Sequence, residues 1–418
     1  MESKTDVIVI GSGAIGISTA YYLWKNGLNV TVIEKDEICS GASKANAGLI
    51  VPSQFIPLAA PGVIAQGLKW MFNPKSPFYI KPRFSLDLLS WVWRFRGACK
   101  KKHMQKAMPI LRDLGLASLA LFEELSDIGG VDFGLEKNGM FILHKSEKGA
   151  EEHQEYKRLA DEIKFDARLL DNKQINEMDS NIRTSAKGGI YFPQDAHLDP
   201  YLFVSNLSKY LEQKGLKIHT STEVLGLEKS NGKITRLKTS KGDFSADEVV
   251  LAAGSWSPAI ERDLRPKLPV QAAKGYSFDV KQPDNMLRIP FICEEAHVAV
   301  TPIGNFIRYS GTFELSRLDL SINRRRVTGM LDSITDFLPG FKPEAVDRTK
   351  IWAGLRPCTP DGLPFVGRFK AFKNVIAAVG HCMLGITLAP ITGKLVSEIV
   401  LNKTPSIPLT LLDVERYS

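Results

Sequence analysis

One glycine-rich turn constrains the fold of this chain more than any other feature. The residues Gly-Ser-Gly-Ala-Ile-Gly at 11–16 directly follow the apolar run Val7–Ile10, and a second apolar run, Val30–Ile33, ends at Glu34. This order predicts a strand, a helix and a second parallel strand, because the three glycines permit a tight turn, close approach of a pyrophosphate and close packing of helix on strand. The N–H groups that begin the helix would face the diphosphate, and Glu34 would accept hydrogen bonds from ribose hydroxyls. The sequence therefore predicts a dinucleotide site, with a glycine turn that binds nothing as the alternative.

Length and composition set the scale of the protein. The 418 residues, 44% hydrophobic and 24% charged, are enough for two domains with substantial cores. No stretch approaches the roughly 20 consecutive apolar residues that span a bilayer, and no basic segment leads into an apolar core at the N-terminus, so a cytoplasmic location is expected. The five cysteines are scattered without a paired spacing. Neither a disulfide framework nor a metal site is therefore predicted.

The charge of the chain favours anionic partners. A formal charge of +8 and a pI near 9.0 suit carboxylate substrates or acidic lipid. No nucleic-acid partner is predicted, because the basic residues are dispersed and no nucleic-acid-binding motif occurs. The segment Trp91–His103 mixes aromatic residues with basic ones and contains Lys100–Lys102. Two interpretations stay open: peripheral contact with anionic lipid at the inner face of the cell membrane, or a core helix with a solvated flank.

The order of apolar runs predicts a fold of mixed α/β and α+β class. A helical pattern fills 86–128, the strand pattern Met140–Leu143 suits a different sheet, and the run Ala246–Gly254 returns the chain to the first sheet. We expect a discontinuous Rossmann-like nucleotide-binding domain with a second domain, built on a different sheet, inserted between its segments. The nucleotide-binding domain is expected at 1–82, 201–268 and 348–418, and the inserted domain at 83–200 and 269–347.

Two later segments carry candidate chemistry. Arg356 stands in a stretch, 354–367, whose prolines and glycines fix the backbone and would aim the guanidinium at a carboxylate. The alternative is a structural arginine that pairs with Asp361 or a carbonyl. The segment Gly380–Thr387 leads from a strand toward a helix, so its N–H groups would face developing negative charge. His381 would add positive charge or tune a redox potential there, or else is simply packed at a turn.

These residues together resemble the flavin-dependent D-amino-acid oxidase superfamily. The resemblance runs essentially end to end and is greatest to its bacterial D-amino-acid dehydrogenase (small subunit) and D-hydroxyproline dehydrogenase branch. The matching motifs, beside the glycine fingerprint, are 41–48, 60–62, Lys69-Trp70-Met71-Phe72, Lys274-Gly275-Tyr276-Ser277, Gly354-Leu355-Arg356-Pro357 and 380–390. The resemblance implies a discontinuous Rossmann-like FAD-binding domain with an inserted mixed-sheet substrate-binding domain.

The resemblance also implies noncovalent FAD and a set of site residues. Arg356 would anchor the substrate carboxylate, and a hydride would pass from the substrate to flavin N5. The predicted catalytic-site residues are Arg356, His381, Tyr276 and Tyr309, the two tyrosines as lining of the pocket. The predicted FAD contacts are Gly11, Ser12, Gly13, Ala14, Ile15, Gly16, Glu34, Lys35, Gly41, Ala42, Ser43, Asn46, Ala47, Gly48, Leu49, Val224, Ala253, Gly254, Trp256, Gly380, His381, Met383, Leu384, Gly385, Ile386 and Thr387.

Substrate and acceptor follow from the same resemblance. Met383 stands where glycine oxidases have a second arginine, which favours a larger or more apolar substrate, including a cyclic imino acid such as D-proline or hydroxyproline. The expected electron acceptor is a quinone or another electron carrier. Two alternatives stay open: an oxygen-using oxidase of glycine, sarcosine or a similar amine, and a flavin-binding subunit of a larger complex. Assembly as a homo- or hetero-oligomer is left open too.

Overall fold

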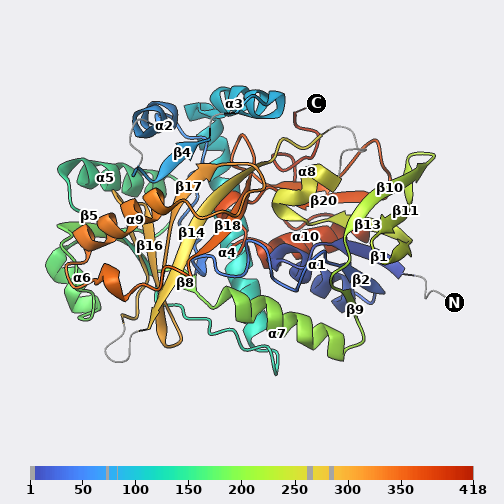
Figure 1. Ribbon diagram of the computed structural model, residues 1–418, viewed down its shortest axis with the longest axis horizontal. Helices are drawn as coiled ribbons and strands as arrows, with labels where there is room; N and C mark the ends of the chain where they lie inside the picture. The colour runs from blue at the N-terminus through green and yellow to red at the C-terminus, as the bar shows by residue number, and fades with distance from the viewer. Residues whose placement is uncertain (1–4, 72–74, 82, 261–266, 282–286, 418) are drawn as a thin grey trace.

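The molecule has two halves, each built on one large sheet, and the halves lie side by side along its long axis (Figure 1). The computed structural model describes residues 5–71, 75–81, 83–260, 267–281 and 287–417. Phe72, which belongs to one motif of the family resemblance, and the predicted domain boundary at residue 82 lie outside the described residues.

The first sheet has six strands in the order β19-β20-β13-β1-β2-β9. The strands from β20 to β9 run parallel, and β19 is antiparallel to β20. The central strands are nearly continuous apolar runs because helices or strands cover both faces of the sheet. The strands are β1 (Thr5–Ile10), β2 (Val30–Ile33), β9 (Lys217–His219), β13 (Ala246–Leu251), β19 (Phe365–Arg368) and β20 (Val375–Val379).

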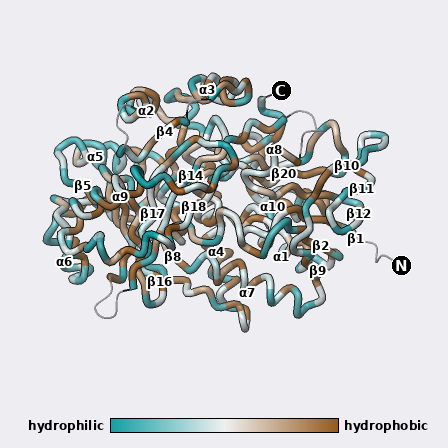
Figure 2. The backbone as a smooth tube through the Cα atoms, in the orientation of Figure 1, coloured by the Kyte–Doolittle hydropathy of each residue, from teal (hydrophilic) through white to brown (hydrophobic). Residues whose placement is uncertain are grey.

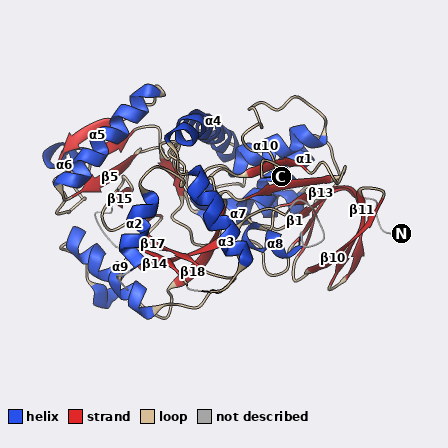
Figure 3. Cartoon of the chain, turned by 90° about the horizontal axis from the view of Figure 1, so that it is seen from above, coloured by secondary structure: helices blue, strands red, loops and turns tan. Residues whose placement is uncertain are grey.

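Helices cover one face of this sheet and a small antiparallel sheet covers the other (Figure 3). On the helical side α1 packs against α7 and α10, and α10 packs against α4. On the other side Ile234 and Leu237 of β11 share a core with Ile8 and Val249. The elements of both layers are α1 (Ala14–Lys25), α4 (Lys101–Ser126), α7 (Pro200–Gln213), α10 (Ala389–Val400), β10 (Val224–Ser230), β11 (Lys233–Thr239) and β12 (Gly242–Phe244).

The second sheet is mixed and has nine strands. Its order is β18-β14-β17-β16-β15-β5-β7-β6, and β4 pairs in addition with β17. The long strands β14 and β17 form its centre. The strands are β4 (Phe78–Ile80), β5 (Met140–His144), β6 (Arg168–Asp171), β7 (Gly188–Phe192), β14 (Gln271–Lys281), β15 (Phe291–Cys293), β16 (Val298–Ile303), β17 (Phe306–Leu315) and β18 (Trp352–Cys358).

The remaining elements surround the second sheet or connect the two halves. Around the sheet lie α2 (Val63–Met71), α3 (Leu86–Ala98), α5 (Glu147–Glu162), α6 (Asn172–Met178) and α9 (Arg324–Phe337). The short elements are β3 (Leu49–Ile50), β8 (Ala196–His197), α8 (Ser257–Ile260), and the 3₁₀ turns η1 (Gly254–Trp256), η3 (Pro343–Ala345) and η4 (Cys382–Leu384).

The predicted fold class is confirmed, but individual elements differ from the expected pattern. The strands β4 and β18 belong to the second sheet, although the sequence analysis assigned both segments to the nucleotide-binding domain. The helical pattern at 86–128 is two helices, with Cys99 and Lys100 between them. The last helix, expected near 386–400, begins at Ala389, and the 3₁₀ turn η4 lies between β20 and this helix.

The helix α3 has a buried side and an exposed side. Trp91 is buried, at 2% exposure, and its Nε1 donates to the carbonyl of Cys358 at 2.9 Å. Trp93 is 74% exposed, and Leu86 and Leu89 are exposed with it. Hydrophobic and hydrophilic residues alternate along α2 and α3 at the surface (Figure 2). The predicted segment thus combines a core residue with an exposed apolar face.

Candidate dinucleotide and substrate site

The glycine fingerprint forms a close turn between β1 and α1. Gly11 has a φ of +107°, and a Cβ there would lie 2.7 Å from the carbonyl oxygen of Ala252, which directly follows β13. A Cβ on Gly16 would overlap the carbonyl oxygen of Gly11. Any larger side chain would therefore displace the helix from the strand. The first turn of α1 contains no acidic residue, which leaves its positive end available to a phosphate group.

Glu34 is held in place at the end of β2. Its Oε2 accepts hydrogen bonds from the N–H of Ser12 at 2.8 Å and from Ser12 Oγ at 2.9 Å, while Oε1 accepts from the N–H of Asp36 at 3.1 Å. The N–H of Thr222 donates to the carbonyl of Glu34 at 2.7 Å, which brings the segment before Val224 alongside. The buried carboxylate is thus oriented next to the fingerprint, as a ribose-binding residue requires.

Three predicted FAD contacts, Lys35, Gly41 and Trp256, lie together after the end of β2. Lys35 Nζ lies 4.3 Å from the centre of the Trp256 ring, and Gly41 faces the same indole. Trp256 is in η1, which follows β13 through Ala253 and Gly254. The ends of β1, β2 and β13 therefore converge on one edge of the sheet, where ligands of doubly wound sheets bind.

The loop 41–48 lies over the start of α1. Ser43 Oγ accepts a hydrogen bond from the N–H of Ala14 at 2.9 Å. Asn46 Nδ2 donates to the carbonyl of Ala42 at 3.3 Å, and Asn46 Oδ1 accepts from the N–H of Gly48 at 2.9 Å. Gly48 has a φ of +68° and fits against the carbonyl of Leu198 only without a side chain. The loop is thus closed on itself and fixed above the helix.

Two residues of the second sheet hold this loop from the other half of the molecule. Ser277 Oγ donates to the carbonyl of Ala45 at 2.6 Å, and Arg308 Nη1 donates to the carbonyl of Asn46 at 3.2 Å. Arg308 also forms a bidentate ion pair with Asp279, at 2.8 and 2.9 Å. Sequence reasoning did not single out Arg308, which stands outside the motifs of the resemblance. The loop therefore lies between both halves of the molecule.

Arg356 lies on the face of the second sheet that meets this loop. It pairs with Ala273 in the register of β18 and β14, and its guanidinium covers Gly275, where any Cβ would overlap it. Trp352, on the same face of β18, folds over Gly354 in the same way. Gly275 and Gly354 are direct cross-strand partners. Two glycines thus form a floor beneath a guanidinium and an indole, and sequence reasoning missed both the floor and Trp352.

The polar contacts of Arg356 bear on its role. Nη1 donates to the carbonyl of Thr312 at 3.0 Å, and burial lowers the pKa of the half-buried guanidinium. Within the described ranges Arg356 forms no ion pair with a carboxylate. Of the two pairings in the alternative, the one with Asp361 is wrong, because that carboxylate binds Arg416 at 2.7 and 3.0 Å, whereas the one with a carbonyl is present, at Thr312. The remaining donors of Arg356 are thus available to a ligand.

Tyr276 and Tyr309 point to the opposite face of the same sheet. Successive residues of a strand alternate between faces, so Tyr276 and Arg356 diverge from the paired strands. Tyr309 stacks on Phe278, with ring centres 5.3 Å apart. Burial raises the pKa of both tyrosines. Both side chains belong to the hydrophobic core of this half, and their predicted part in lining the pocket stays a prediction.

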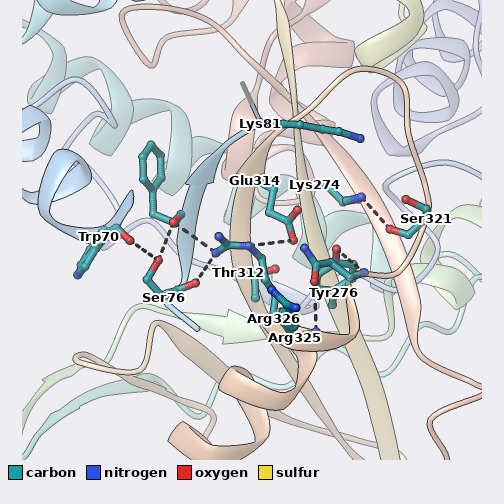
Figure 4. Close-up of polar contacts among 12 residues, drawn as sticks. Trp70, Ser76, Lys81, Lys274, Tyr276, Thr312, Glu314, Ser321, Arg325 and Arg326 are labelled. Atoms are coloured by element: carbon teal, nitrogen blue, oxygen red, sulfur yellow. Dashed lines mark hydrogen bonds and ion pairs between the residues drawn. The ribbon is translucent and has the colours of Figure 1, made fainter. Parts of the chain in front are cut away.

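A buried polar cluster accompanies Tyr276 on that face (Figure 4). The Tyr276 hydroxyl accepts a hydrogen bond from the N–H of Asn323 at 3.1 Å. Arg326 Nη1 donates to the carbonyl of Ser76 at 2.6 Å, and its Nε lies 3.8 Å from Glu314 Oε1. Arg326 also covers the ring of Tyr79. The cluster fastens β4 and the segment before it to β17 and α9, which is a structural role.

His381 is a buried ring at the turn after β20. Its Nε2 lies 2.9 Å from Thr392 Oγ1 of α10, and burial lowers the pKa of the ring to about 3. The imidazole is therefore uncharged near neutral pH. Thr387 Oγ1 donates to the carbonyl of Leu49 at 3.1 Å, so the turn borders the end of the loop 41–48. Met383, which lies between His381 and Thr387 in the sequence, is 52% exposed.

These observations define a class of protein. The site fits the ADP half of a dinucleotide, because it combines the glycine turn 11–16, the oriented Glu34, the fixed loop 41–48 and three converging strand ends. The loop 41–48 also reaches the face that holds Arg356. The arrangement is that of a two-domain, dinucleotide-dependent oxidoreductase, with FAD as the group that these residues would hold.

Comparison with known proteins agrees. The sequence pattern of the family described as FAD dependent oxidoreductase matches residues 6–399. D-amino acid dehydrogenases of Vibrio atlanticus and Neisseria meningitidis serogroup C are 31% and 30% identical, covering 99% and 98% of this chain and 100% and 99% of their own. The crystal structure of glycine oxidase from Geobacillus kaustophilus superposes with a TM-score of 0.80 at 24% identity, covering 99% of both chains. The chain belongs to the FAD-dependent oxidoreductase family and is an FAD-dependent enzyme.

Proposed function

We propose that the protein oxidises the carbon–nitrogen bond of a D-amino acid or cyclic imino acid such as D-proline or hydroxyproline, and passes the electrons to a quinone-type acceptor. The observation that carries this proposal is Arg356, a guanidinium without a carboxylate partner among the described residues, on the face that meets the loop 41–48. D-amino acid dehydrogenases that match the chain over nearly their full length support the same class of substrate.

The residues of the site would bind and orient the substrate. Thr312 accepts from Nη1 of Arg356 and so fixes the guanidinium, whose other N–H groups would bind the substrate carboxylate in two charge-assisted hydrogen bonds. Trp352 would supply an apolar wall beside it, which suits an aliphatic or cyclic side chain. Bound FAD supplies the acceptor for the hydride that leaves the substrate Cα. Fixed orientation of the Cα–H bond would account for much of the rate enhancement.

The amine requires no basic side chain if it binds uncharged. Loss of a hydride from Cα and of a proton from nitrogen gives an imine, which water hydrolyses to a 2-oxo acid and ammonia, whereas a cyclic imine is retained. The turn 380–387 would present backbone N–H groups toward negative charge that accumulates on the reduced cofactor. His381 would act there as a neutral, hydrogen-bonded ring, because burial lowers its pKa to about 3.

Anaerobic reduction of the purified holoenzyme tests the substrate class. D-amino acids, L-amino acids, cyclic imino acids and N-methylglycine are mixed with the enzyme, and bleaching of the flavin absorbance is followed. The proposal expects D-amino or cyclic imino acids to bleach the flavin fastest. Bleaching by glycine or N-methylglycine alone would contradict it.

Reoxidation separates the proposed dehydrogenase from an oxidase. We expect slow reoxidation of the reduced enzyme by oxygen and fast reoxidation by a water-soluble quinone. The glycine oxidase that shares the fold favours the second candidate, an oxygen-using amine oxidase. Prompt reoxidation by air with stoichiometric hydrogen peroxide would establish that candidate. Turnover that appears only after a second polypeptide is added would identify a subunit of a larger complex.

We further propose that the outer face of α3 contacts anionic lipid. No described helix is both long and apolar enough to cross a membrane. Peripheral contact is supported by the exposed Leu86, Leu89 and Trp93, followed by exposed Lys100–Lys102. We expect salt-sensitive flotation with anionic vesicles that Trp93→Ser and neutralisation of the three lysines both weaken. Unchanged flotation of both variants would refute the contact.

A further inference from the structure

Two of the five cysteines meet beside the candidate substrate anchor. Cys358 ends β18, two residues after Arg356, and Cys382 begins η4, directly after His381. Their Sγ atoms lie 2.7 Å apart, and Cys358 forms a backbone bridge with His381. Exposure is 0% for Cys358 and 8% for Cys382. The two cysteines are 24 positions apart in the chain, and their spacing predicted no disulfide.

The surroundings keep the two sulfurs together. Trp91 donates to the carbonyl of Cys358, and its indole shares a small apolar cluster with both cysteines, Ala273 and Leu315. Among the described residues, the only hydrogen-bond partner of each thiol is the other thiol. The pair is therefore held by packing from α3, β14 and β17.

The backbone at Cys382 is a second, independent observation. Its φ is +49°, in the left-handed region that side chains other than glycine, asparagine and aspartate rarely adopt. A glycine would hold this turn without strain, so the cysteine is present at a cost in backbone energy. Such strain persists where the side chain has a use. The strained backbone at position 382 therefore points to a use for the Cys382 thiol.

We propose that Cys358 and Cys382 are a dithiol that is reversibly oxidised to an intramolecular disulfide. The bond would connect β18, which carries Arg356, to the turn that carries His381. Cys382 is the attacking group, because it alone has exposed surface and burial raises the pKa of the Cys358 thiol.

The chemistry balances with a small disulfide as oxidant. The Cys382 thiolate attacks one sulfur of the oxidant and releases one thiol, which leaves a mixed disulfide on Cys382. The Cys358 thiolate then attacks Cys382 Sγ and displaces the second thiol. The two cysteines lose two electrons and two protons, and the oxidant becomes two thiols. Excess dithiothreitol reverses both steps.

Thiol mapping of the FAD-loaded protein tests the proposal. The holoenzyme is incubated with oxidised glutathione and denatured, and the thiols that were not oxidised are alkylated. The peptides are then identified by mass spectrometry. We expect two of the five thiols to be lost and one cross-linked peptide pair to contain positions 358 and 382. Dithiothreitol should reverse both changes. The oxidised form should have a higher Tm, since the cross-link restricts the unfolded chain. Separate alkylation of both cysteines, or a stable mixed disulfide with glutathione, would overturn the proposal.

Matched variants keep the test decisive. Cys382→Gly suits the positive φ and so should fold even if Cys358→Ser does not. In this variant Cys358 should remain alkylatable, and oxidised glutathione should no longer raise the Tm. Cys99→Ser, at a half-buried cysteine after α3, is the control and should form the cross-link as the wild type does. Loss of two thiols from Cys382→Gly would show that another pair reacts.

Discussion

Removal of the Arg356 guanidinium is the sharpest test of the proposed substrate site. Nη1 is engaged with Thr312, so the remaining N–H groups form the proposed fork for the carboxylate. Two charge-assisted hydrogen bonds at about 1.5–3 kcal/mol each give roughly 3–6 kcal/mol in a half-buried site. Because about 1.4 kcal/mol is a factor of ten, Arg356→Ala should lower kcat/KM by about 10²- to 10⁴-fold. Arg356→Lys keeps the charge without the fork and should lose less.

The assay and its control separate binding of the substrate from loss of the cofactor. Flavin content and Tm are measured first, and flavin reduction is then followed anaerobically by stopped flow over a range of substrate concentrations. Arg324→Ala, at an exposed position that begins α9, is the matched control and should behave as the wild type does. A kcat/KM within about threefold of the wild type, in fully flavinated Arg356→Ala protein, would refute Arg356 as the carboxylate anchor.

Three further predictions concern the cofactor and the pH dependence. Gly16→Ala should abolish FAD binding, because its Cβ would overlap the carbonyl of Gly11, whereas Gly129→Ala, with no atom within 4 Å of the new Cβ, should keep the flavin spectrum. Arg308→Ala should release FAD faster, since it removes the contact with the loop 41–48, and an unchanged dissociation rate would contradict this. The pKa of His381 is about 3 in the folded protein and near 6.5 in the unfolded chain. As the pH falls from about 6.5 toward 3, only the unfolded chain binds a proton at this ring, so the folded protein loses stability that it has at neutral pH. His381→Gln should therefore lose about 2 kcal/mol less than the wild type between pH 7 and 5 in denaturant unfolding, and equal losses would show that the ring is not held neutral.

The parts of the fold that the sequence predicted are those with local physical causes. The fingerprint at 11–16 can be recognised because the turn, the helix start and the packing of helix on strand involve neighbouring residues. Glu34 follows from the length of one helix and one strand. The alternation of apolar runs likewise predicted a discontinuous nucleotide-binding domain with a second domain between its segments, since each run must be buried in some sheet; that the second sheet is mixed was implied by the family resemblance.

Residues that act across long sequence distances needed the tertiary structure. The register of β18 against β14 decides that Arg356 and Trp352 share a face over two glycines, while Tyr276 turns to the core. A shift of one residue would exchange these faces, and no local pattern fixes it. Arg308 could not be identified for the same reason, because its partners lie far away in the chain.

The amino-acid sequence by itself determined the dinucleotide fingerprint, the kind of fold and the candidate guanidinium, because each depends on neighbouring side chains and on periodic burial. Only the tertiary structure decided which groups meet. It buried Trp91 while it exposed Trp93, paired Asp361 with Arg416, and brought together two sulfurs that the chain keeps 24 residues apart. Such contacts depend on how strands and helices from distant segments pack, and spacing along the chain does not encode that packing.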